Sequence, residues 1–155
     1  MVLEEDKKFL LRAIGLAKES VQTGGFPAGA VIVKNGEIVG EGLSLGFKNN
    51  DPTGHAETVA IRQACQKLGT ADLTGATLYE SLQACTMCFS AAYWAGISRI
   101  VSAAKKTDEM VKKQYYEGFI APEELNQINN RKIELIQIPE LEEAALEPLK
   151  DFMLR

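Results

Sequence analysis

The stretch AVIVKNGEIVG, from Ala30 to Gly40, indicates the start of a β-sheet. It contains two apolar runs, residues 30–33 and 37–40, on either side of Asn35-Gly36. An Asn-Gly pair between two such runs is the strongest short-range signal for a two-residue hairpin turn. We therefore expect two antiparallel strands here.

Outward from this hairpin, helical and strand patterns follow one another along the chain. Apolar residues at helical spacing precede it, from about Glu4 to Gln22. The expected elements after it are a loop at 49–54, a helix from about 55 to 68, a strand at 76–79, a helix from about 85 to 95, a strand at 99–102, a helix from 107 to about 116 and a strand at 133–138. Pro139 and Pro148 divide the C-terminal stretch into two short helical pieces. This alternation predicts an α/β fold, a three-layer α/β/α sandwich with a central mixed five-stranded sheet.

Length and composition are those of one globular domain. The chain has 155 residues, of which 46% are hydrophobic and 25% charged. We expect residues 1–155 to form a single domain. No apolar run approaches the roughly 18 residues of a membrane span, and the first residues lack the basic and apolar regions of a signal peptide. Three cysteines, two of them in a C-x-x-C, suit a reducing compartment, so we expect a cytoplasmic protein without a membrane partner.

The charge balance disfavours a polynucleotide partner. The net charge is −4, whereas proteins that grip a nucleic-acid backbone need surplus lysine and arginine. The basic pairs Lys105-Lys106 and Lys112-Lys113 are diluted by nearby acids, which is typical of a solvated helix face. A small substrate fits this composition better.

Two short motifs, His55-Ala56-Glu57 and Cys85-Thr86-Met87-Cys88, bring together residue types of a catalytic metal site. Such a zinc site needs three protein ligands, an open position and a nearby acid/base group. Each motif lies at the expected start of a helix, and a right-handed crossover between them would place both starts at one edge of the sheet. Cys85 and Cys88, at i and i+3, share a helix face, and a helix N-terminus favours the thiolate that zinc requires.

Glu57 raises a geometric question. Two residues along an ideal helix rotate a side chain by about 200°, so His55 and Glu57 can face one point only if they straddle an irregular helix start.

Other interpretations of these cysteines remain open on pattern alone. A C-x-x-C at a helix start is also typical of a thiol redox pair or of two buried cysteines. A closed structural zinc site needs a fourth ligand, but the spare Cys65 would lie about 15 Å along the helix from His55. We expect Cys65 to pack in the core.

The combination H-x-E…C-x-x-C resembles the signature of the zinc-dependent base deaminases. The chain is similar to the cytidine-deaminase-like superfamily from about Phe9 to Phe119, and within it most like the bacterial guanine deaminases. The stretches that carry the resemblance are residues 25–33, 50–57 and 85–95, with Thr107-Asp108 further on. The resemblance implies zinc on His55, Cys85 and Cys88, and Glu57 as the group that moves protons between water and the departing amine. It also implies a homodimer, in which the C-terminal helical tail at 139–155 helps close a pocket and is exchanged between subunits.

The chain departs from the family pattern where substrate is recognised. Gln83-Ala84 stands before the first cysteine where the family usually has Glu-Pro, and Ser44 stands where it tends to carry an asparagine. Our candidate substrate-binding residues are Ala28, Ser44, Ala56, Ala84, Trp94 and Glu117. For two of them a structural role is an alternative, since Trp94 can fill the core and Glu117 can be a solvated acid.

These observations predict a zinc-dependent aminohydrolase that releases ammonia from a free heterocyclic amine, with guanine as the first choice of substrate. A tRNA adenosine deaminase is the alternative enzyme, disfavoured by the acidic balance. A non-catalytic zinc-containing binding module is the third, disfavoured by Glu57, which a structural zinc does not need.

Overall fold

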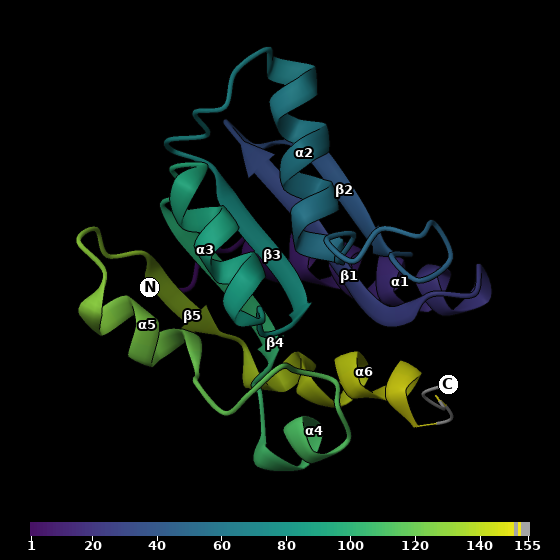
Figure 1. Cartoon of the computed structure of the whole chain (residues 1–155). Coiled ribbons are helices and arrows are strands. Elements are labelled where there is room, and N and C mark those ends of the chain that lie inside the picture. Colours follow the sequence, from purple (N-terminus) through teal and green to yellow (C-terminus); the bar gives the residue numbers. More distant parts are fainter. Residues whose placement is uncertain (151, 153–155) are drawn as a thin grey trace.

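The computed structural model describes residues 1–150 and 152, and its centre is a mixed five-stranded sheet (Figure 1). The spatial order of the strands is β2-β1-β3-β4-β5. Their bounds are β1 Phe26–Lys34, β2 Glu37–Ser44, β3 Thr77–Leu82, β4 Arg99–Ala104 and β5 Glu134–Gln137. β1 pairs antiparallel with β2 and β3, whereas β4 pairs parallel with β3 and β5. The mixed five-stranded sheet is thus confirmed.

Helices cover both faces of this sheet. Their bounds are α1 Asp6–Gln22, α2 Ala56–Leu68, α3 Thr86–Trp94, α4 Asp108–Lys112, α5 Pro122–Ile128 and α6 Glu142–Leu146, with the 3-10 turns η1 Pro139–Leu141 and η2 Glu147–Leu149 around α6. α1 contacts α6 behind the sheet, and α2 lies beside α3 in front of it (Figure 1). The expected three-layer sandwich is confirmed. Among the described residues, no helix has the length and apolar character needed to cross a bilayer.

The hairpin forms as the Asn-Gly pair predicts, but its strands are longer than the apolar runs. Asn35 and Gly36 both adopt positive φ, 53° and 77°. The pairing continues out to Phe26 and Ser44, with register shifts along the way. These irregularities let the strands run past the apolar stretch, and they bring Ser44 to the edge of the sheet where α2 begins.

Glycines in β2 allow α2 to lie directly on the strand. A Cβ at Gly42 would overlap the carbonyl oxygen of Ala56, and one at Gly40 would overlap that of Ala60. The alanines at 56, 60 and 64 are fully buried against this surface. Close packing of the two backbones fixes the distance between α2 and the sheet. It thereby fixes the position of His55, the N-cap residue of α2.

The structure differs from the expectations for the second half of the chain in one helix that is shorter and one that was missed. The helix expected from 107 to about 116 ends at Lys112, because Gln114 takes a left-handed conformation with φ 64°. α5 was not predicted, although Pro122 at its first turn, followed by Glu123 and Glu124, is a helix-start signal. The early end of α4 turns the following segment back toward the front of the sheet.

A polar cluster closes the back of β3. Asp6, at the start of α1, is fully buried and accepts hydrogen bonds from Arg99 Nη1 at 2.7 Å, Arg99 Nη2 at 2.6 Å, the Tyr79 hydroxyl at 2.8 Å and the Leu3 N–H at 2.6 Å. Burial alone would raise the pKa of Asp6, but the hydrogen bonds from Arg99, Leu3 and Tyr79 outweigh it and lower the pKa. This cluster ties α1 to β3 and β4.

Candidate metal centre and substrate pocket

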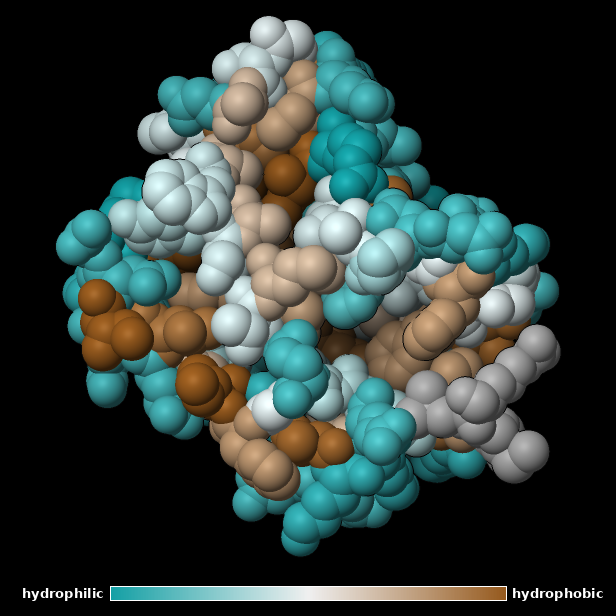
Figure 2. Space-filling view, in the orientation of Figure 1, coloured by the Kyte–Doolittle hydropathy of each residue, from teal (hydrophilic) through white to brown (hydrophobic). Residues whose placement is uncertain are grey.

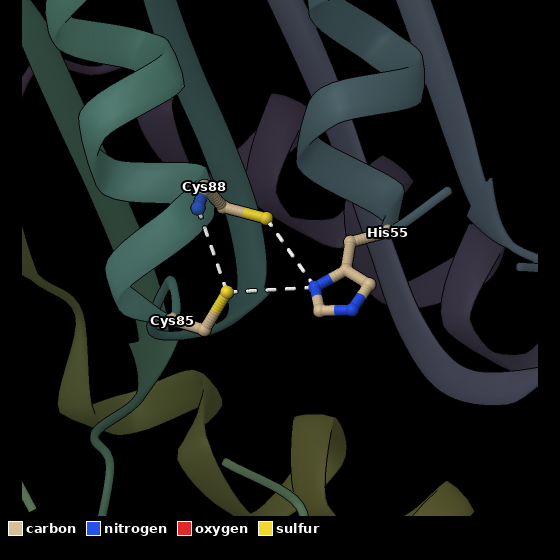
Figure 3. Close-up of side chains that lie close together, drawn as sticks. All are labelled: His55, Cys85 and Cys88. Atoms are coloured by element: carbon tan, nitrogen blue, oxygen red, sulfur yellow. Dashed lines mark hydrogen bonds between the residues drawn. The ribbon is translucent and has the colours of Figure 1, made fainter. Parts of the chain in front are cut away.

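His55 is delivered by the irregular start of α2. It is the N-cap residue, with extended backbone angles of φ −78° and ψ 160°, and the helix begins at Ala56. His55 and Glu57 therefore straddle the helix start, as their two-residue spacing required. The half-buried imidazole points across to α3 (Figure 3).

Cys85 and Cys88 come from the first turn of α3. Cys85 is the N-cap residue, with φ −71° and ψ 172°, and its sulfur accepts a hydrogen bond from the Cys88 N–H at 3.5 Å. Both thiols are buried. The chain reaches this point directly from the C-terminal end of β3. The two helix starts lie side by side, as the sequence predicts.

The three side chains converge on one point (Figure 3). His55 Nδ1 lies 3.4 Å from Cys85 Sγ and 3.5 Å from Cys88 Sγ, and all three ligand atoms lie within 4.8 Å of one another. Tetrahedral zinc, with Zn–S near 2.3 Å and Zn–N near 2.05 Å, requires N–S separations of about 3.6 Å. The donor set and its spacing fit zinc, with three protein ligands and one remaining position.

The electrostatics of the cluster favour a thiolate. Hydrogen bonding from Cys88, together with that from His55, outweighs burial and lowers the pKa of Cys85 to about 5. The hydrogen bond to Cys85 raises the pKa of His55. A negative sulfur is the ligand that a zinc ion needs.

Cys65 takes no part in this cluster. It is a free, half-buried thiol in the last turns of α2 and packs against the core. A closed site with four protein ligands is therefore not built from cysteine here, and the expectation that Cys65 packs in the core is confirmed.

Glu57 brings a buried carboxyl beside the metal ligands. Only 6% of its surface is exposed. Burial, followed by the nearby charge of Cys85, raises its pKa to about 7. A carboxyl with a pKa near neutrality can both accept and donate a proton, which is what general acid/base catalysis requires.

The site opens into a pocket of about 720 Å³. His55, Glu57 and Cys85 form part of its wall. Its other lining residues come from the ends of β1, β2 and β3 and from two loops: Phe26, Ala28, Ser44, Gly46, Phe47, Asn50, Asp51, Pro52, Leu82, Gln83, Gln114, Tyr115, Tyr116 and Glu117. The metal ligands thus have direct access to a space of ligand-binding size.

Three of the six predicted substrate-binding residues lie in this pocket. Ala28 and Ser44 are buried at the ends of β1 and β2 and line it. Glu117 lines it too, and its Oε1 accepts a hydrogen bond from the Thr86 N–H at 3.0 Å. Glu117 is exposed to solvent, as the alternative of a solvated acid requires, but this hydrogen bond ties it to the start of α3, next to Cys85.

The other three predicted residues do not line the pocket. Ala56 and Ala84 are buried, and the Ala84 N–H donates to Glu80 Oε1 at 3.0 Å. Trp94 is the last residue of α3, about 13 Å along the helix from Cys85 at 1.5 Å per residue. Its side chain is 82% exposed, so the alternative of a core residue is wrong.

Sequence reasoning missed an aromatic wall. Phe26, Tyr115 and Tyr116 all line the pocket, and the Tyr116 hydroxyl donates to the Gln83 carbonyl at 2.6 Å. The signal was the Tyr-Tyr pair just before Glu117, but the helix expected there concealed it. Phe152 adds an edge-to-face contact with Phe26, at 5.1 Å between ring centroids.

Residues 3–104 match the family model of the cytidine and deoxycytidylate deaminase zinc-binding region. The chain belongs to this family. The matched region contains all three converging ligands and Glu57. Zinc is therefore the metal of this deaminase-family site, in agreement with the fit of the donor set.

Relatives within the deaminase family act on different substrates. A guanine deaminase from Bacillus subtilis (strain 168) is 50% identical over 101 residues, 64% of this chain and 65% of that protein. A tRNA-specific adenosine deaminase from Buchnera aphidicola subsp. Baizongia pistaciae (strain Bp) is 44% identical over 102 residues, 66% of this chain and 63% of that protein. The chain thus matches slightly less than two thirds of the length of these curated relatives.

A solved structure extends the likeness beyond the zinc-binding region. The X-ray structure of guanine deaminase from Bacillus subtilis superposes with a TM-score of 0.66 and 35% identity, covering 96% of both chains. The superposition thus covers more of the chain than the 101 residues of the sequence match, at a lower identity. The fold is that of the cytidine-deaminase-like proteins.

Proposed function

We propose that this protein is a zinc-dependent hydrolytic deaminase that converts the exocyclic amine of a small heterocycle, guanine first, to a carbonyl and releases ammonia. The observation that carries the proposal is the position of Glu57. Its carboxyl is buried, yet it lines the same pocket as His55 and Cys85. A zinc site with a purely structural role has no use for such a group.

Chemically, water supplies the new oxygen and the amine leaves as ammonia. Zinc supplies Lewis acidity that lowers the pKa of water toward about 7 and makes it nucleophilic. Glu57 accepts a proton as the water oxygen forms its bond to the ring carbon. It then gives that proton to the nitrogen as the C–N bond breaks. One residue thereby serves both proton transfers.

The pocket wall favours a flat ring with hydrogen-bonding edges. Aromatic side chains, Phe26 and Tyr115 among them, offer stacking surface. The Glu117 carboxylate and the Asn50 carboxamide offer acceptors to the N–H groups along one edge of guanine. The guanine deaminase relative, at 50% identity, supports the same substrate.

A tRNA adenosine is the second candidate substrate, because a tRNA-specific adenosine deaminase is 44% identical over 102 residues. The net charge of −4 speaks against it, since an enzyme that grips a tRNA backbone needs surplus positive charge. Guanine remains the first choice.

The test is ammonia release by the zinc-loaded protein, measured across free bases, nucleosides, related amino-heterocycles and a tRNA anticodon stem-loop, with Glu57→Ala as control. Guanine turnover that disappears in the variant is the expected result. Turnover of the stem-loop alone would move the function to the second candidate. Turnover that survives in Glu57→Ala would contradict the mechanism, and zinc binding without turnover of any amine would favour a binding module.

We further propose that residues 1–155 form one deaminase domain that works in the cytoplasm as a homodimer. Trp94 and Ile128, 82% and 80% exposed, lie at the ends of α3 and α5, and apolar side chains gather over the α5 side of this face (Figure 2). Exposed apolar side chains that gather in this way favour a partner, and a second copy is the partner that the family resemblance suggests. Sedimentation equilibrium at micromolar protein tests it, and a monomer mass would refute it.

Exchange of the C-terminal tail between subunits is part of the same proposal. The described part of the 139–155 tail packs on its own chain, where α6 contacts α1 and β4, whereas residues 151 and 153–155 lie outside the described part. Phe152 contacts Phe26 and Tyr115, which both line the pocket, so the tail of either subunit would cap a pocket. Removal of residues 139–155 is expected to weaken substrate binding, and an unchanged KM would refute a role in closure.

A further inference from the structure

Glu80 is a buried acid that the proposed chemistry does not use. It lies in β3, and 1% of its surface is exposed. Its Oε1 accepts two hydrogen bonds, from the Ala84 N–H at 3.0 Å and from the Ser102 hydroxyl at 2.6 Å. Its Oε2 has no hydrogen-bond partner among the described residues. Glu80 also lines a cavity of about 170 Å³, next to Phe89 of α3.

The hydrogen bond from Ala84 to Glu80 gives an acceptor to a backbone N–H that has none in the sheet. The Gln83 N–H is bonded to the Ala104 carbonyl at 2.8 Å, beyond the end of β3. Ala84 follows, 1% exposed, with its N–H past the reach of the sheet ladder. Buried N–H groups require an acceptor, and the side chain of Glu80, four residues earlier, supplies it.

Ala84 is the residue directly before the zinc ligand Cys85. The extended angles of Cys85, φ −71° and ψ 172°, aim its sulfur at His55. The preceding Gln83 is held by its neighbours, since its carbonyl accepts from the Tyr116 hydroxyl and its side-chain oxygen from the Lys106 N–H. Ala84 has no polar side chain, so the hydrogen bond from its N–H is the contact that holds this residue in place.

We propose that Glu80 is a positioning residue for the zinc site, whose Oε1 anchors the Ala84 N–H to β3 and β4 and thereby sets the direction from which Cys85 presents its sulfur. Ser102 completes the anchor, because its hydroxyl holds the same oxygen from β4. The inference concerns zinc binding and stands whichever amine the enzyme deaminates.

The surroundings of Glu80 favour the neutral, protonated form of its carboxyl. Burial, and then the nearby charge of Glu57, raises its pKa well above the ordinary glutamate value. A neutral carboxyl has one carbonyl oxygen, which accepts the two hydrogen bonds at Oε1, and one hydroxyl, which corresponds to the unpartnered Oε2. An amide has the same shape and the same acceptor. Glutamine should therefore replace Glu80, whereas leucine should not.

The experiment measures zinc affinity by chelator competition and the visible absorption of the Co²⁺-loaded protein, which reports ligand geometry. Glu80→Leu is expected to weaken zinc binding about 10- to 100-fold, the usual effect of losing a group that orients a metal ligand, and to change the Co²⁺ spectrum. Glu80→Gln is expected to stay within about threefold of the native protein. Wild-type zinc affinity in Glu80→Leu, or a Glu80→Gln as weak as Glu80→Leu, would overturn the proposal.

Tyr79→Phe is the matched control. It removes a buried hydrogen bond from the neighbouring residue of the same strand, the one to Asp6 on the opposite face. It is expected to lower the melting temperature while leaving zinc affinity and the Co²⁺ spectrum unchanged. A loss of zinc affinity in Tyr79→Phe equal to that in Glu80→Leu would reduce the role of Glu80 to general stability and contradict the proposal.

Ala84→Pro isolates the contact itself, because proline has no N–H to anchor. In the Ala84→Pro background, Glu80→Leu is expected to cost less than about threefold in zinc affinity. A full loss there would show that Glu80 acts by another route. If Glu80→Leu does not fold, Glu80→Asp replaces it, since its carboxyl is one methylene too short to reach Ala84. Wild-type zinc affinity in Glu80→Asp would equally refute the anchor.

Discussion

Tyr79 and Glu80 are neighbours in β3, yet their side chains enter two different polar clusters on opposite faces of the sheet. Behind the sheet, Tyr79 and Arg99 bond to Asp6, and every charge has a partner. In front, Glu80 and Glu57 are buried acids, and no lysine or arginine of the described residues forms an ion pair with either. The back cluster stabilises the fold, whereas burial in the front cluster raises the pKa of both carboxyls and leaves Glu57 able to transfer a proton.

Glu57→Gln is expected to have the largest effect, and it tests whether the front cluster serves catalysis and not stability. The variant keeps the shape of the side chain but cannot move a proton, so kcat is expected to fall about 10²- to 10⁴-fold. The melting temperature should stay the same or rise, because the substitution removes an acid buried without a cationic partner. Ammonia release and thermal unfolding of the zinc-loaded protein measure both effects. A large loss of stability with activity retained would reverse the assignment of the two clusters.

Asp6→Asn should behave in the opposite way. Loss of one partner of the buried pair with Arg99 is expected to cost about 3–5 kcal/mol of unfolding free energy, with zinc affinity unchanged in the folded protein. The folded pKa of Asp6 lies below its ordinary value of 3.8. The difference between native protein and variant should therefore be full above about pH 5 and shrink as the pH falls through the folded pKa. Urea unfolding at several pH values checks this, and a pH-independent difference would contradict it.

Gly42→Val tests the position of the metal site separately from its chemistry, because it displaces the start of α2 and keeps every metal ligand and Glu57. A side chain at 42 would overlap the Ala56 carbonyl and lift the start of α2, at a cost of about 1–3 kcal/mol. Because His55 is the N-cap of α2, zinc affinity should fall about tenfold. Gly15→Ala is the matched control, since a Cβ there meets nothing within 4 Å and the variant should bind zinc normally. Native zinc affinity in Gly42→Val would show that the helix start adjusts on its own.

The smallest effect is expected at the pocket rim. Ser44→Asn places a carboxamide where the chain has a hydroxyl, and one added hydrogen bond to a base is worth about 0.5–1.5 kcal/mol, up to about tenfold in kcat/KM. The gain should be confined to guanine among the tested amines, with zinc affinity unchanged. Steady-state kinetics across those amines measure it. An equal gain for every amine would mean that Ser44 does not contact the substrate.

The sequence predicts the metal site far better than the pocket. His55, Cys85 and Cys88 are predictable because zinc accepts few ligand types and because helix starts after β-strands meet at one sheet edge. Trp94 and Ala84 do not line the pocket of their own chain, since their direction depends on helix length and on which acceptor takes a backbone N–H. Glu80 was not singled out, because in a string of strand residues nothing marks a buried acid as the partner of a peptide group four positions later.

Trp94 is the single tryptophan of the chain, and 82% of its surface faces solvent. The intrinsic fluorescence of the native protein therefore reports on one place, the end of α3, with no second indole to subtract. A surface that covers α3 should shift the emission to shorter wavelength, whereas a ligand that enters the pocket should leave it nearly unchanged. The molecule thus carries its own optical probe for association, separate from the probe for catalysis.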